Sequence, residues 1–184
     1  MSEIIIIDPR KIPLIKLPIV VFVADRSGSF LSSMIKSAYN YNHVMELYKP
    51  GYFASQDMCG FRKVKIEKYL TGRYFLKFVS IKDMTPEERL KWILDIEKDL
   101  AKPWHKKLYD FLGIFGHLLH RITRIKWLRR IVNFPGLAYC VEKVRNRLSY
   151  VFNLLLPLEP EPGEFDKALD DLECCETIGF WFKE

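Results

Sequence analysis

Residues 42–55 read NHVMELYKPGYFAS, and this stretch decides the predicted fold. Two short runs rich in apolar and aromatic residues, 42–48 and 52–55, flank Lys49-Pro50-Gly51, which is a strong turn signal. The stretch therefore predicts a β-hairpin. It places His43 on the first strand and Ser55 on the second.

Further strands are predicted from β-branched and alternating runs on both sides of this hairpin. They are Ile4–Ile7, Ile19–Val23, Phe61–Ile66, Tyr74–Ile81 and Thr177–Phe182. Helical spacing predicts helices over Phe30–Tyr39, from Thr85, from Cys140 and around Phe165–Leu172. We therefore expect an α+β fold over residues 1–184, a single domain in which helices pack against a mostly antiparallel sheet.

The helix that begins after Thr85 has the clearest start signal. Thr85 and Glu88 can form a capping box, and Pro86 suits the first helical position. Its expected buried face is Leu90, Ile93, Ile96 and Leu100, and that of the helix from Cys140 is Val141, Val144, Leu148 and Val151. We expect Pro157, Pro160 and Pro162 to end the second helix and to form a stiff acidic linker.

Composition excludes several classes of protein. The 184 residues are 49% hydrophobic and 28% charged, as in ordinary globular domains. No apolar run approaches the roughly 20 residues of a membrane-spanning helix, and the start of the chain lacks a secretory signal pattern. We therefore expect a cytoplasmic protein. The four cysteines are too few for a disulfide scaffold, so reduced thiols are expected.

The net charge of +6 is unevenly distributed. Residues 102–130 hold eight Lys or Arg and one Asp, whereas residues 158–184 hold nine acids and two Lys. Within the basic stretch, Arg121 to Arg130 has the pattern of an amphipathic helix that binds an anionic membrane surface. The same pattern suits a helix packed on the core with solvated basic edges. No nucleic-acid-binding module is recognised, so nucleic acid is not an expected partner.

Cys140 and His43 are the one pair of residues whose types suit nucleophilic catalysis. Cys140 follows a loop with Pro and Gly and begins an amphipathic helix, where the helix dipole favours a thiolate. A thiolate nucleophile needs an imidazole to hold its proton, so the pair requires the Cys140 sulfur within about 4 Å of a His43 ring nitrogen. A buried core cysteine and an isolated histidine are the alternative interpretation. Cys59, Cys174 and Cys175 have no placed histidine and are interpreted as core or surface thiols, and His117 with His120 lacks further metal ligands.

Three segments resemble the circularly permuted papain-like cysteine hydrolases, the YiiX-like relatives of the NlpC-type cell-wall peptidases. Residues 42–56 are similar to the histidine hairpin of that family, in which a third polar residue follows the histidine by twelve positions. Residues 107–113, KLYDFLG, and 137–142, LAYCVE, are similar to its tyrosine and nucleophile motifs. The short, divergent motifs, with Ser55-Gln56 at the third position, are similar to bacteriophage-encoded members, which would place the protein in the host cell cytoplasm.

The resemblance implies a permuted papain-like fold and a cysteine hydrolase of the amidase, peptidase or acyl-ester type. In that reading Cys140 is the nucleophile, His43 the general base and Ser55 the residue that orients His43, while Tyr109 lies near the oxyanion or in the core. Gln56 could replace Ser55, but strand alternation points it to the opposite face. The implied substrate is a peptide, cell-wall or lipid-type molecule, and no cofactor or metal is needed.

Two departures from the family pattern keep a second interpretation open. Ser55 stands where the family usually has His or Glu, and Val141 replaces the usual Ser after the nucleophile. A serine hydroxyl stabilises an imidazolium less than a carboxylate does. The alternative is a catalytically inactive papain-like binding or structural module, bound peripherally to a membrane or acting through its charged surface. The oligomeric state is left open.

Overall fold

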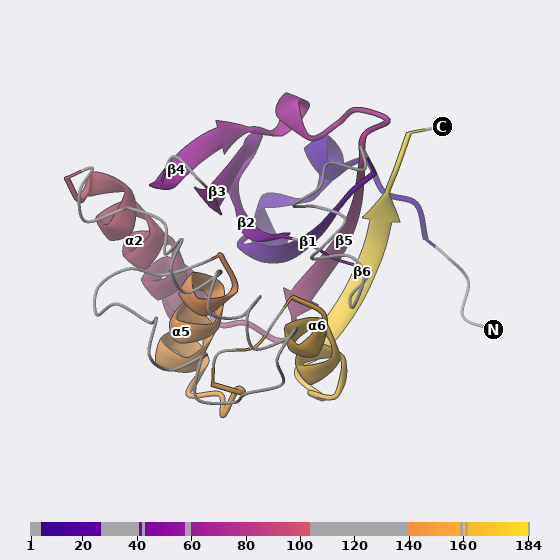
Figure 1. Cartoon of the computed structure of the whole chain (residues 1–184). Coiled ribbons are helices and arrows are strands. Elements are labelled where there is room, and N and C mark those ends of the chain that lie inside the picture. The colour runs from indigo at the N-terminus through magenta and orange to yellow at the C-terminus, as the bar shows by residue number, and fades with distance from the viewer. Residues whose placement is uncertain are drawn as a thin grey trace, which may run out of the picture.

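Six strands form one sheet in the order β4-β3-β2-β1-β5-β6 (Figure 1). The computed structural model describes residues 5–26, 41, 43–57, 60–103, 140–158, 160 and 162–183. All five neighbouring pairs of strands are antiparallel. The strands are β1 (Ile19–Asp25), β2 (His43–Lys49), β3 (Tyr52–Asp57), β4 (Gly60–Lys65), β5 (Tyr74–Ile81) and β6 (Cys175–Trp181).

The predicted hairpin is confirmed. Strands β2 and β3 pair with Met45 opposite Ser55 and Leu47 opposite Phe53. The turn between them uses Gly51 at φ 74°, a left-handed conformation that glycine adopts without steric cost. Pairing shifts by one position between Leu47 and Lys49, next to this turn.

Three α-helices lie among the described residues: α2 (Pro86–Ala101), α5 (Cys140–Phe152) and α6 (Pro162–Asp170). Short 3-10 turns are η1 (Pro9–Lys11), η2 (Leu14–Lys16) and η3 (Ile66–Lys68). The predicted capping box is present, because Glu88 N donates to Thr85 Oγ1 at 3.2 Å and Thr85 N donates to Glu88 Oε2 at 2.9 Å. With its antiparallel sheet and these helices the fold is α+β, as predicted. None of the described helices has the length and apolar character to cross a membrane.

The sheet has two differently covered faces. One face, here called the helix face, carries Val20, Phe22 and Val44, and its core includes residues of α2, α5 and α6 (Figure 1). The other face, here called the opposite face, carries Val21, Val23 and Met45. Its core is completed by residues outside the strands, which include Leu17, Ile66 and Tyr69. Successive residues of β2 therefore enter different cores.

Two details of the helix predictions are wrong. Leu90, expected on the buried face of α2, is 57% exposed. Trp92 is buried on that face instead, and its indole nitrogen donates to the buried Glu46. Pro162 does not extend a linker, because it is the first residue of α6. Helix α5 ends earlier, at Phe152, and Asn153 follows it in a left-handed conformation at φ 54°.

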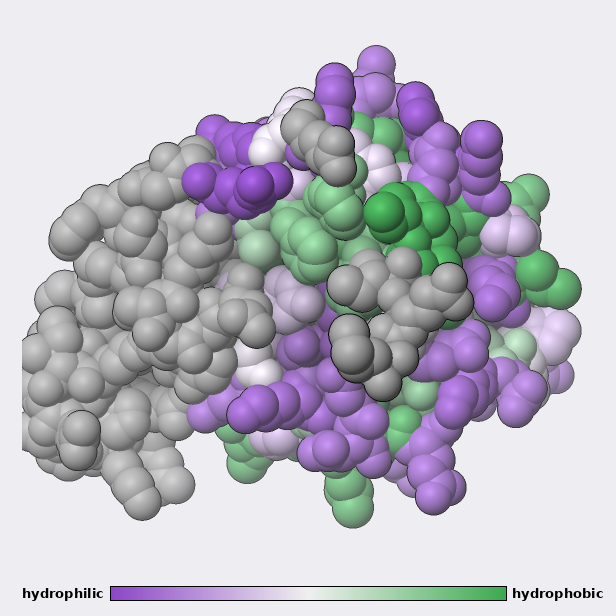
Figure 2. All heavy atoms as spheres, turned by 90° about the vertical axis from the view of Figure 1, so that its right-hand side faces the viewer, coloured by the Kyte–Doolittle hydropathy of each residue, from purple (hydrophilic) through white to green (hydrophobic). Residues whose placement is uncertain are grey.

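The outer edge of β6 is partly covered by residues 5–7. Ile7 N donates to Phe180 O and Phe180 N donates to Ile5 O, both at 2.8 Å. The predicted strand over Ile4–Ile7 is reduced, within its described residues, to one parallel bridge between Ile6 and Phe180. Gly179 makes this close approach sterically feasible, because a Cβ there would lie 2.7 Å from Ile7 Cγ2. Figure 2 looks onto the β6 side and shows hydrophobic residues gathered in the middle of this surface, with hydrophilic ones around them.

Candidate functional site

His43 and Ser55 are in direct contact. His43 Nε2 lies 2.8 Å from Ser55 Oγ, a hydrogen bond between the first residue of β2 and the middle of β3. Ser55 is fully buried and His43 is half-buried. The hairpin register puts both side chains on the opposite face, because Ser55 pairs with Met45 and His43 is two residues from Met45. The hairpin therefore brings these two predicted site residues into hydrogen-bond contact.

Tyr69 lies close to this pair and was not predicted from the sequence. Tyr69 follows η3 directly, and its ring meets the ring of Phe53 edge-on at a centroid distance of 5.5 Å. Burial raises the pKa of Tyr69 to about 12, although a side-chain hydrogen bond with Ser55 acts in the lowering direction. Tyr69 thus lies in the core of the opposite face, the same face that carries His43 and Ser55. No periodic pattern marks Tyr69, because it lies outside the strands.

Cys140 lies on the helix face. It is the first described residue of α5, is 4% exposed, and belongs to the same core as Val44 and Val144. Because β2 alternates, Val44 enters the core of α5 while His43 points away from it. The structure brings His43 and Ser55 together, and the sheet lies between them and Cys140.

Gln56 points where strand alternation predicts. It pairs with Phe61, whose side chain belongs to the core of the helix face together with Cys140. Gln56 and Ser55 therefore lie on opposite faces of β3. Gln56 shares a face with Cys140, and Ser55 shares one with His43, so neither residue brings the predicted nucleophile and base into one group.

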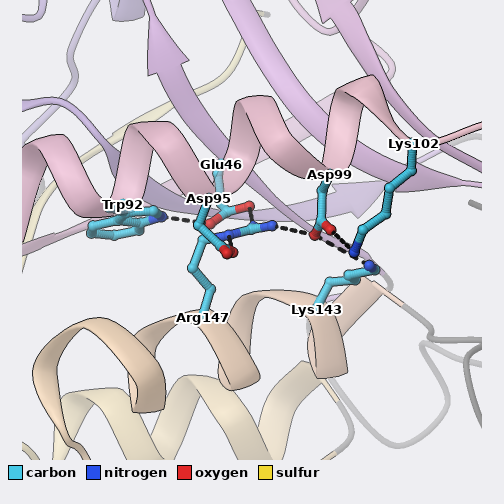
Figure 3. Close-up of polar contacts among 7 residues, drawn as sticks. All are labelled: Glu46, Trp92, Asp95, Asp99, Lys102, Lys143 and Arg147. Atoms are coloured by element: carbon cyan, nitrogen blue, oxygen red, sulfur yellow. Dashed lines mark hydrogen bonds and ion pairs between the residues drawn. The ribbon is translucent and has the colours of Figure 1, made fainter.

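A buried cluster of charges, which was not predicted from the sequence, lies between β2, α2 and α5 (Figure 3). Arg147 of α5 is at its centre, with a side chain 1% exposed. Its guanidinium donates to Asp95 Oδ2 and to Asp99 Oδ2, at 2.7 Å in each case, and to Glu46. Glu46 is fully buried and also accepts a hydrogen bond of 2.6 Å from Trp92 Nε1.

Two lysines complete this charge cluster at its outer end. Lys102 and Lys143 both donate to Asp99, the latter at 3.2 Å. Burial acts to raise the pKa of Asp99, but the hydrogen bond from Lys102 and the charges of Lys143 and Arg147 outweigh it and lower that pKa below its ordinary value. Three carboxylates and three cations thus balance each other. The cluster joins the first turns of α5 to the end of α2.

A second buried cation fixes α6 to the sheet. Lys77 of β5 is 5% exposed, and its amine donates to Asp166 at 2.7 Å and to Asp170 at 2.8 Å. Burial raises the pKa of Asp166 despite the nearby Lys77. Phe165 of α6 packs beside Phe22 of β1, with ring centroids 5.9 Å apart. This ion cluster and the aromatic contact together hold α6 on the helix face.

A surface cavity of about 240 Å³ lies between η2 and the ends of β5 and β6. Its lining includes Lys16, Lys82, Arg89 and Glu176, and none of the predicted catalytic residues. Lys16 pairs with Glu176 at 3.7 Å, and Lys82 donates to the carbonyl of Glu173 at 2.8 Å. These cations are engaged by protein groups, so the cavity does not point to a ligand.

Other predicted features lie outside the described residues. They are the predicted helix Phe30–Tyr39, Cys59, Tyr109, the His117 and His120 pair and the basic stretch Arg121 to Arg130. In the part of the chain that the structure describes, no group of three or more His, Cys, Asp or Glu residues could hold a metal ion. No known family model matches the chain, and no curated protein matches its sequence.

Proposed function

We propose that this protein is a catalytically inactive, papain-like binding module that works at an anionic membrane surface. The observation that carries the first half of this proposal is the sheet between His43 and Cys140. Thiol activation requires the imidazole within hydrogen-bond reach of the sulfur. A core cysteine and a histidine on the other side of the same strand do not meet that requirement.

The buried charge cluster stabilises the arrangement in which Cys140 and His43 are apart. Moving α5 so that Cys140 could reach His43 would separate Arg147 from Glu46, which are 1% and 0% exposed. Leaving one member of a buried ion pair without its partner costs about 3–5 kcal/mol. Cys140 also belongs to the same buried core as Val44. Rearrangement into a catalytic dyad is therefore energetically opposed.

Exposed lysines at the β4 edge of the sheet support binding to an anionic membrane surface. Strand β4 and the turn η3 carry the exposed side chains of Lys63, Lys65 and Lys68. None of the ion pairs between described residues involves these three lysines. Each basic residue near an anionic lipid surface contributes about 1 kcal/mol of attraction. The basic stretch 102–130 adds further positive charge in sequence, and within it Arg121 to Arg130 has a pattern typical of helices on membranes.

Thiol labelling tests the inactive state. A C59S/C174S/C175S variant keeps Cys140 as its single thiol, and iodoacetamide labelling is followed at pH 6 in native buffer and in urea. We expect native labelling at least about tenfold slower than in urea, with no change when H43A is added. Rapid native labelling at pH 6 that H43A abolishes would overturn the proposal, because it would report a His43-activated thiolate.

Liposome flotation tests the membrane surface. The intact chain is mixed with vesicles of phosphatidylcholine alone or with phosphatidylserine added, at low and high salt. We expect salt-sensitive binding to the anionic vesicles, reduced at least about tenfold by K63E/K65E. K98E/K183E reverses two exposed charges away from β4 and η3 and serves as the matched control. Equal binding by K63E/K65E, or stronger binding to RNA than to lipid, would refute this surface.

A cysteine hydrolase is the second candidate, and the hydrogen bond between His43 and Ser55 favours it. In that function Cys140 attacks an amide or ester carbonyl, His43 accepts the thiol proton and then protonates the leaving group, and Ser55 orients His43. A screen of peptide, cell-wall and acyl-ester substrates with the intact chain, C140A and H43A separates the two candidates. Turnover lost in both C140A and H43A would establish the hydrolase.

A further inference from the structure

Cys174 and Cys175 are adjacent in the connection between α6 and β6, on the lower right of Figure 1. Backbone hydrogen bonds fix this turn from two sides. Cys175 N donates to Leu172 O at 2.9 Å, and Lys82 N donates to Cys174 O at 2.7 Å. Cys175 is also the first residue of β6 and pairs with Ile81 of β5.

The two thiols share one core and differ in exposure. Both side chains lie at the core of the helix face, Cys175 as a buried member and Cys174 packed against it, although neighbouring residues of a regular strand would point to opposite faces. Cys174 is half-buried and accessible to small reagents, whereas Cys175 is 8% exposed. Burial, together with the neighbouring Cys174, raises the pKa of Cys175 to about 12, so its thiol stays protonated near neutral pH.

We propose that Cys174 and Cys175 form a vicinal dithiol that hydrogen peroxide converts to a disulfide within the turn. The Cys174 sulfur attacks one peroxide oxygen, the O–O bond breaks, and a sulfenic acid and one water are formed. The Cys175 sulfur then attacks the Cys174 sulfur, the S–O bond breaks, and the released hydroxide takes the Cys175 proton as a second water. Two thiols are oxidised and one peroxide is reduced.

This disulfide is expected to be reversible. Cα atoms of neighbouring residues lie about 3.8 Å apart across a trans peptide, closer than the usual range of about 4.4–6.8 Å in disulfides. Such strain makes a disulfide easier to reduce, and strained bonds are the labile ones. The site therefore suits transient oxidation in a reducing compartment.

Formation of the Cys174–Cys175 disulfide would change the backbone at the start of β6. The peptide between Cys174 and Cys175 must leave its present conformation, in which Cys174 O accepts from Lys82 N and Cys175 pairs with Ile81. We expect the first pairings between β5 and β6 to weaken while the remainder of the sheet persists. Amide exchange at Lys82 is a direct reporter of this change.

Peptide mapping of the whole folded chain tests the proposal. Trypsin releases residues 168–183, a peptide that contains both cysteines and no others. After peroxide treatment we expect this peptide to lose two hydrogen atoms, the protein to form no disulfide between chains, and dithiothreitol to restore the original mass. Faster amide exchange at Lys82 should accompany oxidation. A peptide that keeps both thiols, or a disulfide to another cysteine or another chain, would overturn the proposal.

Single-cysteine variants assign the order of attack. In C175S, Cys174 should accumulate as a sulfenic acid that dimedone traps, whereas the unsubstituted pair should trap little because the ring closes. In C174S, the buried Cys175 should react at least about tenfold more slowly with peroxide. C140S is the matched control and should oxidise like the original chain. Equal dimedone trapping in C175S and the original chain would contradict a resolving role for Cys175.

Discussion

Arg147 Nη2 donates to Asp99 Oδ2 at 2.7 Å inside the interface of α2 and α5. The same guanidinium also contacts Asp95 and Glu46, so one side chain joins two helices to the central part of the sheet. Its aliphatic stem and charged head are both buried, and its side chain is 1% exposed. The cluster therefore contributes to stability as a unit, and single substitutions should reveal this.

R147M should lower the free energy of unfolding by about 3–5 kcal/mol, because it leaves the fully buried Glu46 without its cation. The double variant E46L/R147M should recover most of this loss, since replacing both charges by apolar groups removes the uncompensated charge. Urea denaturation followed by circular dichroism measures both. K98A, on the exposed side of α2, is the control and should change stability by less than about 0.5 kcal/mol. A loss in R147M no larger than in K98A would contradict the role assigned to the cluster.

D99N should make the protein less sensitive to acid. The pKa of Asp99 is lowered in the folded state, so its ionised form stabilises the fold above about pH 4, and this contribution is lost as the pH falls through the folded-state value. We expect D99N to cost about 2 kcal/mol at pH 7 and to approach the original chain near pH 2. D171N, at an exposed position after α6, is the control. Parallel pH profiles for D99N and the original chain would be inconsistent with this assignment.

Y69F should reduce alkaline destabilisation. The pKa of Tyr69 is raised to about 12, so its neutral form stabilises the fold below about pH 10, and this contribution is lost as the pH rises from there through 12. The original chain should lose about 2 kcal/mol more than Y69F between pH 9 and 12. Y150F removes the hydroxyl of an exposed tyrosine and is the control. The same loss in all three proteins would rule out this role for Tyr69.

G179A should detach residues 5–7 from β6. A Cβ at position 179 would lie 2.7 Å from Ile7 Cγ2 and 2.9 Å from Ile5 O, and the second contact is with backbone that cannot rotate away. We expect a loss of about 1–3 kcal/mol and faster hydrogen exchange at the amides of Ile7 and Phe180. The matched control is G72A, whose Cβ would have an ordinary 3.7 Å contact with Lys183 O. Unchanged exchange at both amides would disprove the steric argument.

Local patterns in the sequence predict most of the described elements correctly. The hairpin of residues 42–55, strand β5 and the Thr85 capping box all depend on neighbours within a few positions, where periodicity and turn chemistry act directly. The contact of His43 with Ser55 follows from the same hairpin register. These features were predictable because their partners are close in sequence.

Contacts between elements that are far apart in the sequence were not predictable in the same way. Which face of β2 receives α5 decides whether Cys140 and His43 share a core. Between its two end residues, β2 is apolar on both faces apart from Glu46. Glu46 and Arg147 are 101 positions apart, so no local pattern connects them. A usable signal did exist in retrospect: each of these charges stands within an otherwise apolar stripe, and buried charges require partners.

The two edges of the sheet respond differently to solution conditions. At β6, residues 5–7 occupy part of the edge by hydrogen bonding, which salt does not screen. At β4, protection against pairing with another molecule rests on the mutual repulsion of lysines such as Lys63 and Lys65, and salt shortens the range of that repulsion. Concentrated solutions should therefore stay dispersed at low ionic strength, and any edge-to-edge association at high ionic strength should begin at β4.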